Sequence, residues 1–184
     1  EGTAYVGESI DVQDWAVSGM LTEADLEVLY SIYGWDLANH SANHMWLGDR
    51  TDAATIEAFQ QDYLDNQNWL LANGWTRGAY HLAYTGGSHN DELIESLKGI
   101  GVETARTTIY GLESSLVEDF YRLKTINVLY GLDYVKEKID DAVSSGSPII
   151  LMVHGINNSG KEYVISTAEF QEIVDYVSGY SQKG

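Results

Sequence analysis

The sequence predicts an α/β fold, in which short strands alternate with helices around a mostly parallel sheet. Apolar runs and helical periodicities alternate along the chain, as expected when each strand is followed by a helix that packs on the sheet. Ile149 to Val153 is also an uninterrupted run of five apolar residues. Such a run predicts a central parallel strand buried on both faces.

In the first half of the chain, the predicted strands are short and the predicted helices have recognisable ends. Thr22 is suited to cap the first helix, whose apolar face carries Leu26, Leu29 and Tyr33. Asn73-Gly74 ends the long second helix. The predicted strands are 3–6, 35–38 and 78–84, and the predicted helices are 22–33, 52–72 (buried stripe Ile56, Phe59, Tyr63 and Leu70) and one carrying Leu93, Ile94 and Leu97.

The second half continues the alternation. A loop with a short helix is expected between about residues 107 and 121, and a polar tail over 178–184. The remaining predicted elements are strands at 102–105, 125–130 and 149–153, a helix at 133–144 with Val135, Ile139 and Val143 inward, and a last helix carrying Phe170, Ile173, Val174 and Val177.

The length and composition suit a single globular domain over residues 1–184. Hydrophobic residues make up 44% of the 184 residues and charged residues 21%, an ordinary balance for a folded domain. No linker, repeat or low-complexity segment divides the chain. No apolar run approaches the roughly 18 residues of a transmembrane helix, and the first residues lack the basic start and apolar stretch of a signal peptide.

The charge and the cysteine content limit the function. A formal net charge of −18 excludes nucleic acid as a partner, because binding to phosphates needs a basic face. Solubility, or a salty or calcium-rich setting, explains the acidity. With no cysteine, a transition-metal site must use His, Asp or Glu.

The sharpest local signal is a histidine pair after the second predicted strand. His40 and His44 are four residues apart, so on one helical turn both imidazoles reach one cation. Taken alone, a chance or capping pair is an equal alternative. His154 directly follows the apolar run 149–153, so all three histidines are expected at carboxyl ends of strands, where α/β barrels collect their active sites. One shared site is the more economical explanation.

These residues resemble motifs of a known family. The stretch 34–44 contains a glycine, a short strand and His-Ser-x-x-His, and Leu151-Met152-Val153-His154 is similar to a Leu-x-His motif. Both resemble the NodB-homology polysaccharide deacetylases, the fourth carbohydrate esterase family, and most of all its phage and cell-surface versions. The resemblance covers nearly the whole chain. It implies a distorted (β/α)7-type barrel that is incomplete at both ends.

The resemblance implies roles for particular residues. In the family, two motif histidines and an aspartate bind a divalent metal, usually zinc, and a neighbouring aspartate is the general base. His40 and His44 would therefore bind zinc, which polarises the acetyl carbonyl and its bound water. His154 would protonate the leaving group as general acid. Ser41 and Asn43 are expected to support the ligands or, more in keeping with their chemistry, to cap local backbone.

The first departure from the family is the missing Asp-Asp segment. The family carries it on a strand before the part matched here by residues 3–6, whereas Asp11 and Asp14 follow that strand and are poor substitutes. The family's closing strand also has no match. The chain is then a fragment, a domain completed by a strand from another chain or segment, or a non-catalytic relic. We favour the fragment.

The second departure lies in the family's Arg-Pro-Pro-Tyr-Gly loop, which here is approximately residues 83–87. The arginine has no match, but the oxyanion donor is a backbone N–H and tolerates substitution; it is expected near Gly86, within one or two positions. Tyr84 lines the substrate groove or simply packs. His81 and His89 flank this loop; His89 facing the groove is one alternative, but an exposed loop residue without a role is the favoured expectation for each. Trp46 stacks on a sugar ring or packs on the adjacent helix, with equal weight.

The sequence thus predicts a zinc-dependent hydrolase that removes N- or O-acetyl groups from a polysaccharide outside the cell, at a cell surface or on a virion. The alternative is an inactive, deacetylase-like binding or structural module of a virion or surface protein. The Asp-Asp pair distinguishes the two, because a parent protein without it upstream of Glu1 would lack the catalytic base.

Overall fold

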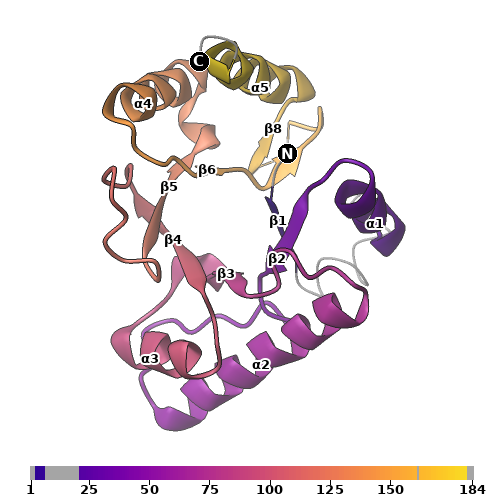
Figure 1. Cartoon of the computed structure of the whole chain (residues 1–184), viewed down its shortest axis with the longest axis vertical. Helices are drawn as coiled ribbons and strands as arrows, with labels where there is room; N and C mark the ends of the chain where they lie inside the picture. Colours follow the sequence, from indigo (N-terminus) through magenta and orange to yellow (C-terminus); the bar gives the residue numbers. More distant parts are fainter. Residues whose placement is uncertain (1–2, 7–20, 161, 182–184) are drawn as a thin grey trace. The chain divides into compact units, whose positions relative to one another are not determined.

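The computed structural model describes residues 3–6, 21–160 and 162–181 (Figure 1). Asp11 and Asp14 lie outside these residues. The chain forms two compact units. The first comprises Glu1–Thr107 with Phe120–Arg122, and the second comprises Thr108–Asp119 with Leu123–Gly184.

The first unit is built on a parallel sheet with the strand order β1-β2-β3-β4. Thr3 pairs with Asp36, Asn39 with Leu82, and Ala83 with Arg106. Because the strands are parallel, the residues that follow β2 and β3 emerge at the same edge of the sheet. The strands are β1 (Thr3–Val6), β2 (Asp36–Asn39), β3 (His81–Ala83) and β4 (Thr104–Tyr110), and the helices are α1 (Glu23–Ser31), α2 (Ala53–Ala72), the 3₁₀ turn η2 (Thr85–Gly87) and α3 (Asp91–Gly99).

The helices of the first unit begin where the sequence predicts. Thr22 and Asp25 form a capping box at α1, and the Asp52 carboxylate accepts a hydrogen bond from the N–H of Thr55 at α2. α2 and α3 pack side by side (Figure 1). The predicted stripe of α2 is buried in two clusters: Ile56, Phe59 and Tyr63 pack with α3, and Leu70 packs with Leu26 of α1.

The strand predicted over 78–84 is shorter because a glycine turn precedes it. Gly78 has a φ of +122°, and its carbonyl accepts a hydrogen bond from the N–H of His81, so β3 begins only at His81. A side chain at Gly78 would place its Cβ 2.5 Å from the Leu37 oxygen. Tyr33 lies beyond the end of α1 and is exposed, so the apolar face predicted for this helix stops short of it.

In the second unit, the end of β4 is followed by β5 and β6 in the sheet order. Its core joins η3, α4 and α5 around Val128, Val135 and Ile173. The elements are β5 (Leu123–Asn127), the 3₁₀ turn η3 (Val128–Tyr130), α4 (Leu132–Ser145), β6 (Leu151–Met152), β7 (Gly155–Ile156), β8 (Val164–Ile165) and α5 (Thr167–Ser181).

Several predicted boundaries in the second half are wrong. The segment expected to be a loop with a helix begins with strand, because β4 runs to Tyr110, and the rest of it contains no helix. The predicted strand 125–130 ends at Asn127. The Asn127 side chain accepts a hydrogen bond from the Leu129 N–H and so caps η3. β6 spans only two of the five apolar residues, which are half-buried apart from Met152. Among the described residues its ladder partner is β5, so it is not the doubly covered strand expected.

The last two helices differ from expectation in their inward faces and ends. Val143 is exposed and Ala142 is buried, because at about 3.6 residues per turn Ala142 falls closer to the line of Val135. The expected polar tail begins as helix, since α5 runs to Ser181. Its last turns are held by the hydroxyls of Tyr176 and Tyr180, which both donate to the Asp140 carboxylate on α4.

Candidate functional site

The histidine pair lies in a tight turn at the carboxyl end of β2. Ser41 and His44 have φ values of +64° and +52°, and residues 40–44 are not helical. The expected helical turn is therefore wrong, but the two imidazoles still meet. Their ring centroids are 5.0 Å apart, at an interplanar angle of 79°.

The tautomer of His40 is set by β3. Its Nδ1 lies 2.8 Å from the Ala83 carbonyl oxygen; a carbonyl only accepts, so Nδ1 carries the proton and Nε2 keeps its lone pair. A metal-binding histidine is commonly held by such a bond from its other ring nitrogen. Two imidazoles that bind zinc at about 2.0–2.1 Å in tetrahedral geometry have ring centres about 5 Å apart. The pair fits two positions of a zinc site.

Buried amides of β2 and α2 support the start of the turn. The Asn39 side chain donates to the Tyr63 carbonyl at 3.0 Å, and its oxygen accepts from the Ser41 N–H at 2.8 Å and from the Asn66 amide at 3.0 Å. Asn39, Ser41 and Asn66 are each fully buried. A buried, satisfied network of this kind fixes one conformation, and here it fixes the residues on both sides of His40.

A carboxylate of α2 supports the second half of the turn. Asp62 accepts from the Asn43 N–H, at 3.1 and 3.2 Å to its two oxygens, and from the Asn43 side-chain amide at 2.6 Å. The Ser41 hydroxyl oxygen accepts a hydrogen bond from the Met45 N–H at 3.0 Å. Ser41 therefore caps local backbone as favoured, whereas the Asn43 side chain bonds a carboxylate of α2 rather than local backbone. Asp62 and Asn66 did not stand out in the sequence, although both interrupt the apolar stripe of α2.

The loop after β3 lies next to the histidine turn. Gly86 has a φ of +60°, and a Cβ there would lie 3.1 Å from Cδ1 of Trp46. Gly87 and Ser88 donate their N–H groups back to Tyr84 and Thr85 within η2, whereas Gly86 donates to no other residue that the structure describes. The Gly86 N–H is thus available to a ligand. The sheet register also places Arg106 beside Ala83.

Trp46 covers this loop with one part of its ring and leaves the rest open. Its six-membered ring would lie 3.4 Å from a Cβ on Gly48, and the side chain is 59% exposed. It therefore contacts both glycine turns and also presents aromatic surface to solvent.

The other residues of this loop are mainly structural. Tyr84 is fully buried in the core, which favours packing over a place in the substrate groove. His89 stacks on it, with ring centroids 5.1 Å apart, and makes a 2.9 Å hydrogen bond to the Gly87 carbonyl. His81 lies in β3, 2.9 Å from the Thr104 hydroxyl. Both histidines are half-buried, so the expected exposure is wrong for each, and the expected loop position is wrong for His81.

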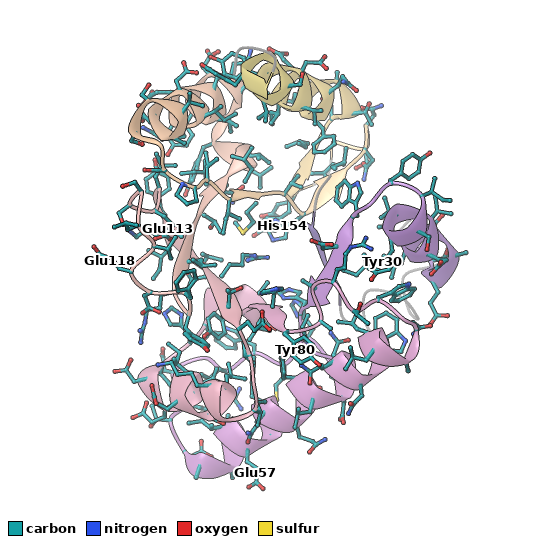
Figure 2. All side chains as sticks on the ribbon, in the orientation of Figure 1. Tyr30, Glu57, Tyr80, Glu113, Glu118 and His154 are labelled. Carbon is teal, nitrogen blue, oxygen red and sulfur yellow. The ribbon has the colours of Figure 1, made fainter. Side chains whose placement is uncertain are left out.

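His154 belongs to the second unit and lies two residues beyond β6 (Figure 2). It is exposed, and its ring centroid lies 5.8 Å from that of Tyr163. Tyr163 has a φ of +62° and directly precedes β8. The small parallel pair of β7 and β8, which periodicity does not predict, fixes both ends of the loop between these rings.

Within the described residues, no group of three or more His, Asp or Glu side chains forms a metal site. The residues that fit are the two histidines, one of them with its tautomer fixed. A zinc site needs at least one more protein ligand, for which an oxygen of Asp or Glu is chemically suitable.

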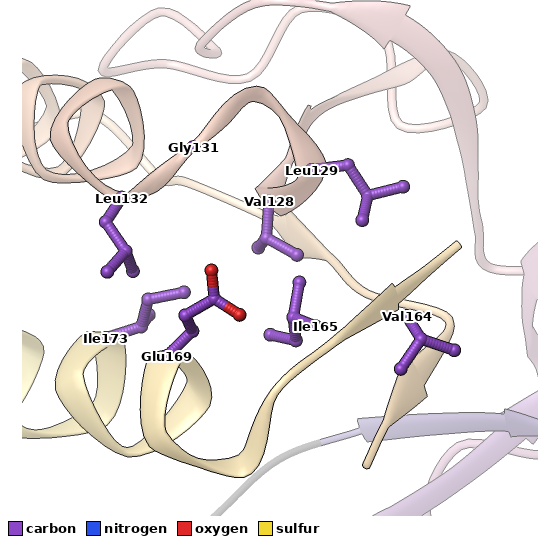
Figure 3. Close-up of a pocket in the computed structure, with 8 residues that line it drawn as sticks. All are labelled: Val128, Leu129, Gly131, Leu132, Val164, Ile165, Glu169 and Ile173. Atoms are coloured by element: carbon purple, nitrogen blue, oxygen red, sulfur yellow. The ribbon is translucent and has the colours of Figure 1, made fainter. Parts of the chain in front are cut away.

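An apolar pocket of the second unit carries one carboxylate, that of Glu169 (Figure 3). Hydrogen bonds from the Ser166 hydroxyl and N–H lower the pKa of Glu169 below its ordinary value. A carboxylate that caps its own helix in this way is a weak general base. The lining residues are Val128, Leu129, Gly131, Leu132, Val164, Ile165, Glu169 and Ile173.

Comparison with solved structures identifies the class of fold. The deacetylase PplD of Streptococcus pyogenes, solved in complex with acetate, matches with a TM-score of 0.53 and 17% identity, over 67% of this chain and 52% of PplD. The BpsB deacetylase domain of Bordetella bronchiseptica matches at 0.48 and 16%, over 57% and 48% of the two chains. IcaB of Ammonifex degensii matches at 0.43 and 14%, over 49% and 41%.

The likeness to PplD confirms the predicted fold class, the β/α barrel type of the NodB deacetylases. The chain spans about half the length of PplD. No family model matches the sequence, and no curated protein sequence matches it significantly. No helix among the described residues is long and apolar enough to cross a membrane.

Proposed function

We propose that the chain is the metal-binding part of a zinc-dependent polysaccharide deacetylase that acts on an acetylated glycan outside the cell or on a virion. The observation that carries the proposal is the His40–His44 pair at the end of β2, with ring centroids 5.0 Å apart and with Nδ1 of His40 held by the Ala83 carbonyl oxygen. PplD, whose fold this chain shares, is a deacetylase solved with acetate.

The role proposed for each residue follows from the chemistry of its side chain or backbone group. His40 and His44 would hold the metal, which would supply the polarisation of the acetyl carbonyl and of a bound water. The Gly86 N–H donates to the oxygen that becomes negative during attack. Trp46 offers an exposed aromatic face to the sugar.

His154 is proposed as the general acid that protonates the departing amine or alkoxide. It is exposed, so both solvent and a substrate can reach its ring, and imidazole is a common general acid. The base and the third metal ligand would come from carboxylates outside the described residues or from another segment or chain.

The proposal is tested on the full-length protein by metal analysis and acetate release. We expect about one zinc ion per chain and acetate release from an acetylated glycan. His40→Ala and His44→Ala should lose both while their circular dichroism is unchanged. His81→Ala is the matched control, because this histidine of β3 contacts Thr104 of β4 and the variant should keep both activities.

Metal binding and acetate release together distinguish the deacetylase from the binding module. A full-length protein that binds no divalent metal contradicts the proposal. Metal binding and glycan binding without acetate release would instead favour the alternative, a deacetylase-like binding module.

A further inference from the structure

The second unit carries a short sequence motif twice. Ile109-Tyr110-Gly111-Leu112 and Leu129-Tyr130-Gly131-Leu132 are 20 residues apart. The first ends β4, and the second ends the η3 turn that directly continues β5. Gly111 and Gly131 have φ values of +143° and +101°, so in both copies the chain bends immediately after the tyrosine.

The two tyrosines and a third one form a cluster, which we call the tyrosine platform (Tyr110, Tyr130 and Tyr134). The ring centroids of Tyr110 and Tyr130 are 6.1 Å apart at 83°, and those of Tyr130 and Tyr134 are 5.7 Å apart at 80°. Tyr110 and Tyr134 are 5.9 Å apart at 32°. Two rings are therefore roughly parallel, and the third stands almost perpendicular to both.

The platform is not part of the core. Tyr110 is 51% exposed and Tyr130 65% exposed, whereas the core of the same unit is filled by residues such as Val128, Val135 and Ile139. Tyr134 is half-buried behind them and lies 5.6 Å from the Lys138 ammonium. Clustered, exposed aromatic surface of this kind marks a binding site more often than isolated apolar residues do.

The chemistry of the platform selects among ligands. Phenol rings offer an apolar face and a polar edge, which matches a sugar ring with C–H groups on its faces and hydroxyls around its rim. Nucleobases also stack on aromatic rings, but the net charge of −18 repels their phosphates. The loop after Tyr110 carries Glu113 and Glu118 (Figure 2), which also disfavours an anionic ligand.

The geometry points to the tyrosine platform as a second glycan-binding site, which holds neighbouring sugar units of an uncharged or amino-sugar polysaccharide. The inference deepens the proposed function and rests on it for the ligand class. It assigns the binding to Tyr110 and Tyr130, with Tyr134 as the ring that backs them.

Titration calorimetry on the full-length protein tests the inference with three probes: N-acetylchitohexaose, its deacetylated form and acetylated xylan. Binding of at least one probe is expected. Tyr110→Ala and Tyr130→Ala should each weaken it by about 2- to 10-fold, the range expected for one aromatic contact. The double variant should weaken it further, and Phe at both positions should preserve it. Tyr33→Ala is the matched control, because Tyr33 is 64% exposed in the first unit.

A second measurement uses the unmodified protein and does not depend on the folding of a variant. Bound glycan should protect Tyr110 and Tyr130 from nitration, as measured by mass spectrometry, while Tyr33 stays reactive. Binding of none of the probes, equal protection of all three tyrosines, or unchanged affinity in the double variant would overturn the inference.

An esterase assay distinguishes failure of the tyrosine platform from failure of the proposed deacetylase function. Hydrolysis of 4-nitrophenyl acetate needs the metal site and no glycan, so the double tyrosine variant should keep it. His40→Ala should lose hydrolysis but still bind glycan. Binding without hydrolysis in the unmodified protein refutes the enzyme and leaves the platform, whereas hydrolysis with unchanged glycan affinity in the double variant refutes the platform alone.

Discussion

The position of His40 and His44 depends on side chains of α2 that are not themselves candidate metal ligands. The turn over residues 40–44 contains two non-glycine residues with positive φ, Ser41 and His44, a conformation that costs free energy unless the surroundings enforce it. The surroundings here are side chains of α2: Asp62 holds Asn43, and Asn66 holds Asn39. The helix therefore sets the distance between the two imidazoles.

We expect Asp62→Ala to weaken metal binding by about 10- to 100-fold, the usual cost of losing a group that orients a ligand. The change leaves the N–H and the side-chain amide of Asn43 without their acceptor. It should also lower the free energy of unfolding by about 1–3 kcal/mol. Zinc affinity is measured by competition with a chelator, and stability by urea unfolding.

Asp65→Ala is the matched control for this prediction. Asp65 lies on the same helix but is exposed, and it accepts a hydrogen bond only from Gln61 among the contacts described. Its loss should leave zinc affinity unchanged. Equal zinc affinity in Asp62→Ala and in the unmodified protein would show that the turn holds its shape without the carboxylate.

At this scale, the sequence singled out the histidine pair, whose rings lie close together, but not its conformation, and the role of the pair stays a prediction. His40, His44, Ser41 and Asn43 stood out through spacing and residue type. The helical turn assigned to them was wrong, because positive φ at Ser41 is imposed by tertiary hydrogen bonds that periodicity does not record. Asp62 and Asn66 carried a visible signal, since polar residues at buried positions of an apolar stripe need a partner.

At the scale of elements, the packing of β2 against the turn before β3 depends on a glycine. Gly78→Ala would combine a strained φ of +122° with a Cβ 2.5 Å from the backbone oxygen of Leu37. Because backbone rather than a flexible side chain stands in the way, β2 and β3 would have to separate. We expect a loss of at least about 3 kcal/mol of stability, measured by urea unfolding.

Gly74→Ala provides the comparison. Its φ is also positive, at +79°, but nothing lies within 4 Å of the added Cβ. Gly74→Ala should lower the free energy of unfolding by only about 1–2 kcal/mol, because a residue with a side chain is strained in a left-handed conformation. Similar losses in the two variants would mean that conformational strain, rather than the close approach to Leu37, decides the effect.

The elements that the sequence predicted correctly are those with local signals. Caps and apolar stripes located α1 and α2 to within a residue or two, and the apolar positions of α3 were predicted without its ends, since capping and amphipathicity are properties of a short segment. β6 was overestimated because an apolar run reports hydrophobicity but not the number of neighbouring strands. The β7–β8 pair and the full length of β4 depend on pairing between distant residues, which no local pattern contains.

At the scale of the whole molecule, the dominant feature is the excess of 28 acidic over 10 basic residues. Mutual repulsion at neutral pH opposes the compact state. Three carboxylates act in the opposite sense, because each caps a helix. Backbone N–H bonds from Thr22 and Thr55 lower the pKa values of Asp25 and Asp52, and the Ser166 hydroxyl lowers that of Glu169.

These two effects predict a maximum in stability at mildly acidic pH. A carboxylate whose pKa is lower in the folded state stabilises it above its ordinary pKa, here 3.8 for aspartate and 4.5 for glutamate. That stabilisation is lost as the pH falls through the lower, folded value. At higher pH, proton uptake instead reduces the net negative charge of −18 and with it the mutual repulsion. The melting temperature, measured by calorimetry with a chelator present, should therefore rise and then fall below about pH 4.

Salt tests the electrostatic origin of this maximum. About 0.5 M sodium chloride shortens the screening length to a few ångströms, so it should raise the melting temperature more at pH 8, where repulsion is largest, than at pH 5.5. The chelator matters because acid would also release any bound metal, which would destabilise the protein for a different reason. A melting temperature at pH 8 that does not respond to salt would mean that the acidic residues are too far apart to repel one another, and that the charge serves solubility alone.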